Sequence, residues 1–290
     1  MLIVPGTNYK RQPSERTTGI GSGFYPGADI VIVHYPASAR PYTGINSLTA
    51  KESVRIGAAN LDAAIRAADR PLVVVGQSQG AVVIDAAQAK LASDPTAPTA
   101  DELQFVLFSD PHRGLMSLLP KGTYIPVFDW TTTTPVDSQY DTTIVIGEYD
   151  GWADPLDRPW NLLAAANALM GAGATRWFRT RAGRASREPA IHGRTRWANP
   201  ADIPQENIKV TTNSRGAKVT TMRVPTKTLP LTDPLRRVVA DRVVDRIDKV
   251  LRPRIDAGYS RTDKSGDRRI FVAGGRLKRR NAGDDVLQPS

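Results

Sequence analysis

The stretch PLVVVGQSQGAVVIDAAQAKL, residues 71–91, joins a strand-like segment to a helix-like segment around one serine. Residues 72–75 form a short, wholly apolar, β-branched run, as expected for a strand that is buried on both faces. After Gly80 the chain carries apolar residues that suit a helix, and no proline interrupts them. The pentapeptide G-Q-S-Q-G between the two segments therefore predicts a strand–turn–helix with Ser78 at the turn.

Ser78 would lie at the carboxyl end of this strand, with its hydroxyl held out on a strained turn. Gly76 and Gly80 flank it at places where a Cβ atom would collide with neighbouring backbone. The free N–H groups of the helix N-terminus would face any oxyanion that develops beside the serine. The pattern favours a nucleophilic serine, and the alternative is an ordinary turn with a solvent-facing serine.

Strand-like and helix-like segments alternate on both sides of this stretch. Thr49 and Glu52 predict a capping box at the start of the helix that precedes it. Such alternation predicts an α/β-hydrolase fold, an α/β architecture with a mainly parallel central sheet flanked by helices. Strands are expected at residues 1–4, 28–34, 72–75, 103–108 and 142–146, and helices at 54–68, 81–93 and 159–170.

The last third of the chain has a different pattern. Residues 208–212 and 218–224 flank a turn-like Asn-Ser-Arg-Gly segment and predict a hairpin. Asp233-Pro234 predicts the start of a helix that ends before Pro253. One face of that helix is expected to be apolar, through Leu235, Val238, Val239, Val243, Ile247 and Val250.

Residues 1–260 are therefore expected to form the hydrolase domain. Beyond Tyr259 the composition becomes polar and basic, so residues 261–290 are expected to form a basic, weakly ordered C-terminal tail.

The composition is that of a soluble globular protein, with 40% hydrophobic and 23% charged residues among 290. No apolar run approaches the roughly 20 residues that a membrane-spanning helix needs. The absence of cysteine excludes disulfides, thiolate metal sites and cysteine nucleophiles. Residues 1–4 lead directly into Pro5-Gly6, which predicts no secretory signal peptide and hence synthesis in a cytoplasm.

The net charge of +10 is concentrated in an arginine-rich segment at residues 176–196 and in the basic run 276–280. The sequence has no zinc-finger spacing, RNP motif or clear helix-turn-helix, so a nucleic-acid partner is disfavoured. An anionic envelope surface is the favoured partner for the arginine-rich segment, with a solvated face as the alternative. Its basic residues are Arg176, Arg179, Arg181, Arg184, Arg187, Arg194 and Arg196.

A nucleophilic serine needs a histidine, and the chain has only three. In α/β-hydrolases the catalytic residues follow the order serine, acid, histidine. His34 precedes Ser78. His112 comes before any candidate acid, so it is disfavoured as the base and could instead line the cleft. His192 follows the last predicted parallel strand and its helix and is the favoured base. The alternatives for His192 are a surface histidine or an anion contact.

The acid is expected just beyond the strand at residues 142–146. Asp150 falls where the chain turns over toward the site, and its carboxylate would fix the tautomer of His192 and stabilise the imidazolium. Asp154 is the alternative acid, although it could instead cap the following helix or hold the loop. For the oxyanion hole, the backbone N–H groups of Thr7 and Gln79 are the candidates.

Several stretches carry a family resemblance: PGTNYK at residues 5–10, HYPASARPYTG at 34–44, GQSQGA at 76–81 and EYDGWADPLDRPW at 148–160. With VPTKTLPLTDPLR at 224–236, they make the chain resemble the PE-PPE domain over roughly residues 1–260. This family of mycobacterial-type serine α/β-hydrolases is similar to cutinases. The resemblance implies an esterase or lipase that uses Ser78, an aspartate of residues 149–155 and a histidine that matches His192.

We therefore expect a serine carboxylesterase or lipase that hydrolyses acyl esters of lipids or of the cell envelope through an acyl-enzyme. This chemistry needs no metal and no organic cofactor. The apolar side chains of residues 114–140 would form an acyl-binding wall or, alternatively, pack in the core. The resemblance also suggests a stand-alone enzyme, phage-encoded, that acts at the envelope after lysis or as part of a virion. The alternative function is a non-catalytic envelope-binding or virion module that keeps the hydrolase fold.

Overall fold

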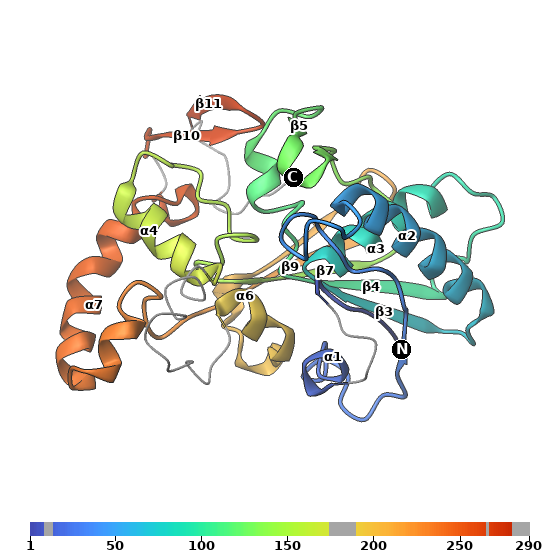
Figure 1. Ribbon diagram of the computed structural model, residues 1–290, viewed down its shortest axis with the longest axis horizontal. Helices are drawn as coiled ribbons and strands as arrows, with labels where there is room; N and C mark the ends of the chain where they lie inside the picture. The colour runs from blue at the N-terminus through green and yellow to red at the C-terminus, as the bar shows by residue number, and fades with distance from the viewer. Residues whose placement is uncertain (9–13, 174–189, 265–266, 280–290) are drawn as a thin grey trace. The chain divides into compact units, whose positions relative to one another are not determined.

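The computed structural model describes residues 1–8, 14–173, 190–264 and 267–279 (Figure 1). The chain divides into two compact units. The first comprises residues 1–112, 121–146 and 195–224, and the second comprises residues 113–120, 147–194 and 225–290.

A central sheet organises the first unit, and its strands run in the order β2-β1-β3-β4-β7-β9-β8. The pairs β1/β2, β1/β3, β3/β4 and β4/β7 are parallel, whereas β8 and β9 are antiparallel. The predicted α/β-hydrolase fold with a mainly parallel sheet is thus confirmed. The strands are β1 (Leu2–Val4), β2 (Val31–Ile32), β3 (Leu72–Gln77), β4 (Leu103–Phe108), β7 (Thr142–Gly147), β8 (Ile208–Thr212) and β9 (Lys218–Val224).

Successive side chains along the strands point to opposite faces of the sheet, and both faces are buried. Leu2 and Val4 belong to a cluster with the helices α2 (Ala50–Ala67) and α3 (Gln79–Leu91), which pack against each other. Ile3, between them, belongs to a second cluster that contains Ile20, which follows α1 (Glu15–Thr18). The sheet is therefore covered on both sides, as its apolar strands require.

Several predicted elements of this unit are confirmed. The capping box of α2 is present, because Thr49 and Glu52 each bond the other's backbone N–H. The predicted hairpin pairs Ile208 with Met222 and Thr212 with Lys218. The strand expected over residues 28–34 is only two residues long. The unit also contains β5 (Tyr124–Ile125), η2 (Pro126–Phe128), β6 (Trp130–Thr131), η3 (Thr195–Trp197), η4 (Pro200–Asp202) and η5 (Gln205–Asn207).

The second unit is built around two helices, α4 (Leu162–Gly171) and α7 (Asp241–Asp256). Ala164 of α4 and Ile255 of α7 share a fully buried cluster with Tyr149, Leu229 and Tyr259. Its other elements are η1 (Leu115–Leu118), α6 (Ile191–Arg194), η6 (Asp233–Arg237), η7 (Ser260–Thr262), β10 (Ile270–Ala273) and β11 (Arg276–Arg279).

The prediction of a helix from Asp233 to just before Pro253 is wrong. Residues 233–237 form the short η6, and α7 begins at Asp241 and continues through Pro253. The buried carboxylate of Asp248 explains the separation, because it accepts hydrogen bonds from the backbone N–H of Leu229 and the hydroxyl of Thr232. These bonds hold residues 229–232 beside the middle of α7. A single helix running from Asp233 through α7 would separate these residues from Asp248, so η6 and α7 are separate helices.

The predicted apolar face of this helix is also wrong. The buried residues of α7 are Val244, Asp248 and Ile255, whereas Val243 and Val250 are exposed. The helix therefore presents Val243 and Val250 outward, although the sequence pattern assigned both to the core.

The expectation of a weakly ordered tail also fails at residues 270–279, where β10 and β11 form an antiparallel hairpin. The N–H of Val272 donates to the carbonyl of Asp157, and Gly274 and Gly275 donate to the carbonyls of Ser117 and Leu118. Among the helices in the described part of the chain, none combines the length and apolar character needed to cross a membrane.

Candidate active site

Ser78 lies at the junction of β3 and α3 in a conformation that few non-glycine residues adopt, with φ 57° and ψ −122°. The turn is tight because two glycines allow close backbone contacts. A Cβ atom on Gly80 would lie 2.0 Å from the carbonyl oxygen of Val4, and one on Gly76 would lie 2.6 Å from the carbonyl oxygen of Gly80. The G-x-S-x-G spacing is thus a steric requirement of this turn.

The loop after β1 passes directly beside Ser78. A Cβ atom on Gly6 would lie 3.0 Å from the carbonyl oxygen of Gln77 and 3.2 Å from the Cβ of Ser78, and Thr7 is the next residue. The side chain of Gln79 is anchored away from the turn, since its amide donates to the carbonyl of Ser38 at 2.8 Å. Its backbone N–H is the first of α3 and has no intrahelical acceptor.

The second unit brings Asp150 and His192 together. The Nδ1 atom of His192 lies 2.9 Å and 3.0 Å from the two carboxylate oxygens of Asp150. Asp150 is fully buried and also accepts the backbone N–H of Trp152 at 3.0 Å. The imidazole is held on α6, and its ring centroid lies 6.4 Å from that of Trp152. This arrangement orients the ring and favours the tautomer with hydrogen on Nδ1.

The carboxylate of Asp154 bonds to Arg261 and to the backbone of Tyr149. Its carboxylate accepts two hydrogen bonds from Arg261, at 3.1 Å and 2.8 Å, and one from the backbone N–H of Tyr149 at 2.9 Å. Its own N–H donates to the carbonyl of Asp150 at 2.7 Å. Asp154 and Arg261 therefore fix the loop that carries Asp150.

Arg261 is a residue of this candidate site that the sequence analysis did not identify. Burial acts to lower its pKa, but the charges of Asp154 and Glu148 and the hydrogen bonds to Asp154 raise the pKa of this guanidinium overall. The guanidinium also lies over the ring of Tyr259 at 4.4 Å from the centroid. No motif in the sequence indicated it, because its partner Asp154 lies 107 residues earlier in the chain.

His112 forms another histidine–aspartate pair, inside the first unit. Its Nδ1 lies 2.9 Å from a carboxylate oxygen of Asp85, and its Nε2 lies 2.7 Å from the carbonyl oxygen of Thr133. The carboxylate and the carbonyl accept hydrogen bonds, whereas the Thr133 hydroxyl, 2.8 Å from Nε2, can donate or accept, so both ring nitrogens are bonded within the fold. Burial acts to lower the pKa of His112, but Asp85, Asp110 and the Thr133 carbonyl raise it overall. A buried imidazole whose two nitrogens are both bonded within the fold is a structural group.

Several predicted features lie outside the described residues or differ from expectation. Five arginines of the arginine-rich segment lie outside them. Arg196 is held in the structure: it donates to the carbonyl of Arg16 at 2.7 Å, and burial together with Arg16 lowers its pKa to about 10. The arginines outside the described residues are Arg176, Arg179, Arg181, Arg184 and Arg187.

His34 is exposed on the chain after β2, and Asn60 donates to its carbonyl.

The segment expected to form an acyl-binding wall is exposed at two of its apolar residues in the first unit. Tyr124 is 55% exposed and Val127 is 60% exposed. The core-packing alternative therefore does not hold for these two side chains.

The structure thus assembles part of the predicted site in each unit. Ser78, Thr7 and Gln79 lie together in the first unit, and Asp150 and His192 are in contact in the second. The meeting of Ser78 with the Asp150–His192 pair stays a prediction. Among the described residues, no cluster of three or more histidine and carboxylate side chains is arranged to hold a metal ion.

A comparison with protein-family models matches residues 26–260 to the PE-PPE domain. Diacyltrehalose acyltransferase Chp2 of Mycobacterium tuberculosis is 40% identical over 278 residues, which cover 89% of this chain and 73% of that protein. From the same organism, SL1278 acyltransferase Chp1 is 39% identical, with 89% and 63% covered, and Esterase PE16 is 35% identical, with 90% and 48% covered. The chain thus spans between about half and three quarters of the length of these relatives.

Among solved structures, a cutinase-like protein from Cryptococcus sp. matches 53% of this chain and 77% of its own, at 17% identity and a TM-score of 0.34. The fold assignment rests on the order of the strands and on the strand–turn–helix at Ser78.

Proposed function

The chain belongs to the PE-PPE domain family, and on that premise we propose that it acts on acyl esters by nucleophilic catalysis at Ser78. The observation that carries the proposal is the backbone of Ser78 between β3 and α3. Holding a non-glycine residue at such a positive φ angle costs about 1–3 kcal/mol, and backbone strain of this size clusters at functional sites. Here it supports a hydroxyl that projects from the turn toward a substrate.

In the proposed reaction, the Oγ of Ser78 attacks the acyl carbonyl and passes its proton to the Nε2 of His192. Asp150 stabilises the imidazolium that results. The imidazolium then gives the proton to the departing alcohol, and the acyl group remains on Ser78 as an ester. The bond between Nδ1 of His192 and the buried carboxylate of Asp150 supports these roles, because it fixes the ring with Nε2 as the basic nitrogen.

The oxyanion of the tetrahedral intermediate would accept hydrogen bonds from the backbone N–H groups of Thr7 and Gln79. The close approach of Gly6 to Ser78 supports the first donor, and the place of Gln79 at the start of α3 supports the second. The side-chain amide of Gln79 is bonded to Ser38, which supports a role for its backbone alone.

Hydrolysis of the acyl-enzyme by water would make the protein a carboxylesterase or lipase, which is the function that we favour. Transfer of the acyl group to an alcohol is the second candidate, because the relatives at 40% and 39% identity are named acyltransferases. The two reactions share the acyl-enzyme and differ only in whether water or a substrate hydroxyl attacks it. Lipid-like or cell-envelope esters are the proposed substrates.

A fluorophosphonate probe tests the shared step. We expect the folded chain to be labelled at Ser78, which peptide mass spectrometry would locate, and we expect no labelling of Ser78→Ala. His192→Gln should be labelled far more slowly, because the hydroxyl then lacks its base. If the folded wild-type chain resists the probe and gives only background rates on p-nitrophenyl esters, the chain is a non-catalytic module.

A further inference from the structure

The helix α4 presents an uncharged apolar face to solvent. Its sequence, LLAAANALMG, contains no charged residue. Leu162 is 79% exposed and Leu169 is 62% exposed, and their spacing of seven places them on the same face. Trp160, just before the helix, is 52% exposed. Exposed residues grouped in this way mark a contact surface, whereas isolated ones would need no explanation.

One flank of α7 continues this character and adds positive charge. Val243 and Val250, again seven residues apart, are 39% and 59% exposed. At about 100° per residue, the charged residues nearest to this stripe are Arg246 and Arg254, followed by Arg242, and all three are exposed. This flank therefore combines apolar and basic side chains without an acidic one.

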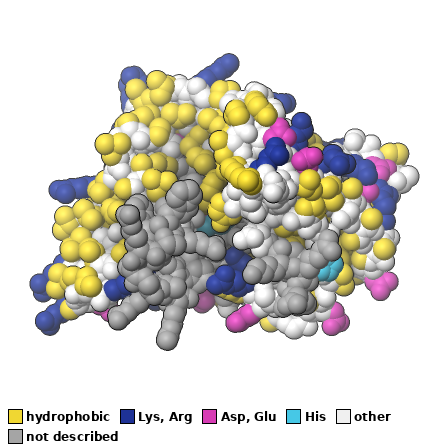
Figure 2. Space-filling model, viewed as in Figure 1, with side chains coloured by type: hydrophobic (Ala, Val, Ile, Leu, Met, Phe, Trp, Pro, Cys, Tyr) yellow, Lys and Arg dark blue, Asp and Glu magenta, His cyan; other side chains and the backbone are white. Residues whose placement is uncertain are grey.

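The apolar face of α4 lies next to this flank of α7. The side chain of Asn161, at the start of α4, donates to the carbonyl of Arg254 in the last turn of α7 at 2.8 Å. Ala164 and Ile255 pack in one buried cluster beneath them. Figure 2 shows hydrophobic side chains gathered over α4 and α7, with Lys and Arg side chains along the outer margin.

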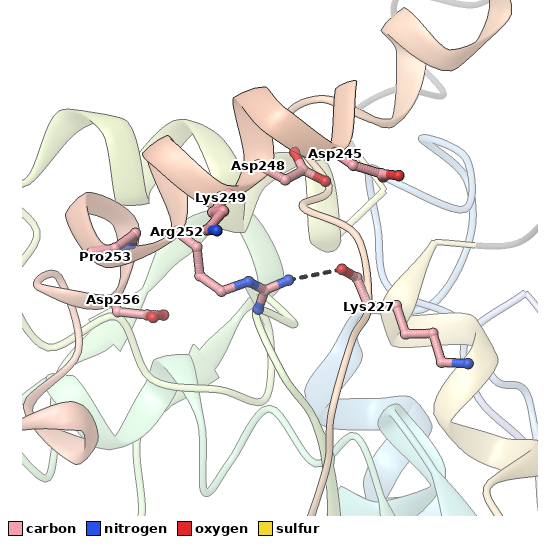
Figure 3. A pocket seen from close by; sticks show the side chains of 7 residues that line it. All are labelled: Lys227, Asp245, Asp248, Lys249, Arg252, Pro253 and Asp256. Atoms are coloured by element: carbon pink, nitrogen blue, oxygen red, sulfur yellow. Dashed lines mark hydrogen bonds between the residues drawn. The ribbon is translucent and has the colours of Figure 1, made fainter. Parts of the chain in front are cut away.

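The opposite flank of α7 is different (Figure 3). A groove of about 460 Å³ lies there, and its charges are balanced between three basic and three acidic side chains. Arg252 is bonded to the carbonyl of Lys227, and Asp245 is paired with Arg236 at 2.8 Å. The charged residues that line the groove are Lys227, Lys249, Arg252, Asp245, Asp248 and Asp256. The groove therefore has no net attraction for one sign of charge, in contrast to the flank beside α4.

We propose that the outward face of α4 and the adjoining flank of α7 form a docking surface for an anionic lipid surface. The leucines and valines would enter the boundary between headgroups and acyl chains, and the arginines would bind the phosphates. A tryptophan beside such a face is typical of membrane interfaces. A second copy of the chain fits less well, because a two-fold contact through this face would bring the arginine flanks of both copies together.

Flotation of the full chain with vesicles of phosphatidylcholine and phosphatidylglycerol in equal parts tests this surface. We expect wild-type binding that is lost with pure phosphatidylcholine and weakened by salt. Leu162→Ser/Leu169→Ser/Val250→Ser should weaken binding about a hundredfold, because each apolar side chain contributes on the order of 1 kcal/mol. Arg246→Gln/Arg254→Gln should weaken it roughly thirtyfold, at about 1 kcal/mol per arginine.

The matched control is Ile45→Ser/Val210→Ser, which changes two apolar residues of the first unit that are 77% and 58% exposed. It should bind as the wild type does. Addition of vesicles should shift the tryptophan emission to shorter wavelength, and Trp160→Phe should reduce this shift. Equal losses in the control and triple variants would overturn the proposal, as would absence of wild-type binding. Sedimentation would also overturn the proposal if the wild type is a dimer and the triple variant differs from it only in being a monomer. None of these readouts depends on activity at Ser78.

Discussion

Two histidine–aspartate pairs in this molecule have nearly the same geometry and different surroundings. In each pair, Nδ1 lies 2.9 Å from a carboxylate oxygen that belongs to a buried aspartate. The side chain of His112 is 5% exposed, and its Nε2 is bound to the carbonyl of Thr133. The side chain of His192 is 16% exposed and is held on the short helix α6.

The difference shows that a histidine–aspartate contact does not by itself identify a catalytic base. A base must have a nitrogen that can exchange a proton with the substrate, whereas both nitrogens of His112 are bonded to groups of the fold. Asp85 lies on α3, so the pair of His112 ties the helix that begins after Ser78 to the chain after β4. We therefore expect loss of His112 to weaken the fold and loss of His192 to abolish the chemistry.

The largest expected effect is that of His192→Gln. Without its base, the reaction should lose about 10⁴ in kcat, the order of magnitude known for triad defects in serine proteases. The melting temperature should change little, because the side chain is partly exposed. Esterase assays and thermal denaturation would measure both quantities. The matched change His112→Gln should lower the melting temperature and leave kcat of the folded protein within about tenfold; the reverse pattern would exchange the two roles.

The next largest effect is on stability. Asp85→Asn removes the carboxylate that raises the pKa of the buried His112 ring, so the free energy of unfolding should fall by about 3–5 kcal/mol. Urea unfolding would measure it. Asp62→Asn is the control on the neighbouring helix α2, because the partners of Asp62, Arg66 and Lys90, are 34% and 59% exposed. Its loss should stay below about 1 kcal/mol, and equal losses in the two variants would argue against a charged His112.

A smaller effect concerns Arg261, which holds the loop that carries Asp150. Arg261→Lys removes the forked contact with Asp154 and loosens the loop of Asp150, so kcat should fall about tenfold with little change in KM. Arg158→Lys is the control, since Arg158 makes a similar buried contact with Asp263 in the same unit. Both variants should lose comparable stability, but only Arg261→Lys should lower kcat. An unchanged kcat in Arg261→Lys would limit Arg261 to a structural role.

Local sequence patterns predicted the features of this site that depend on neighbours along the chain. The β-branched run before Ser78, the two glycines around it and the order of the histidines are all visible in short windows. Asp150 and Asp154 could not be ranked with certainty, because both lie in one loop and their difference depends on Arg261, more than a hundred residues later. Long-range pairing of this kind leaves no local periodicity.

The errors in the C-terminal third have a related physical cause. The predicted apolar face of α7 placed Val243 and Val250 toward the core, yet Asp248 lies on the buried side. Asp248 is held there because it accepts the N–H of Leu229 and pairs with Arg236. A buried, satisfied carboxylate reverses the face that a hydrophobic pattern would select. The hairpin at residues 270–279 was missed because its contacts are to the carbonyls of Asp157, Ser117 and Leu118.

The smallest expected effect is the pH dependence of stability that His112 contributes. Burial acts to lower the pKa of this ring, but Asp85, with Asp110 and the carbonyl of Thr133, raises it above its ordinary value in the folded protein. A group whose pKa is raised on folding contributes stability that is complete below its ordinary pKa of about 6.5. That contribution is lost as the pH rises through the raised pKa, with a slope of at most about 1.4 kcal/mol per pH unit for one proton.

The difference in unfolding free energy between wild type and His112→Gln should therefore be larger near pH 6 than near pH 9, the range in which histidine titrates. The corresponding difference for the exposed His34→Gln should be small at both pH values. A His112 difference that is constant would mean that folding leaves the pKa of this ring unchanged, and one that grows with pH would mean that folding lowers it. Either result would mean that the two histidine pairs differ less than their surroundings indicate.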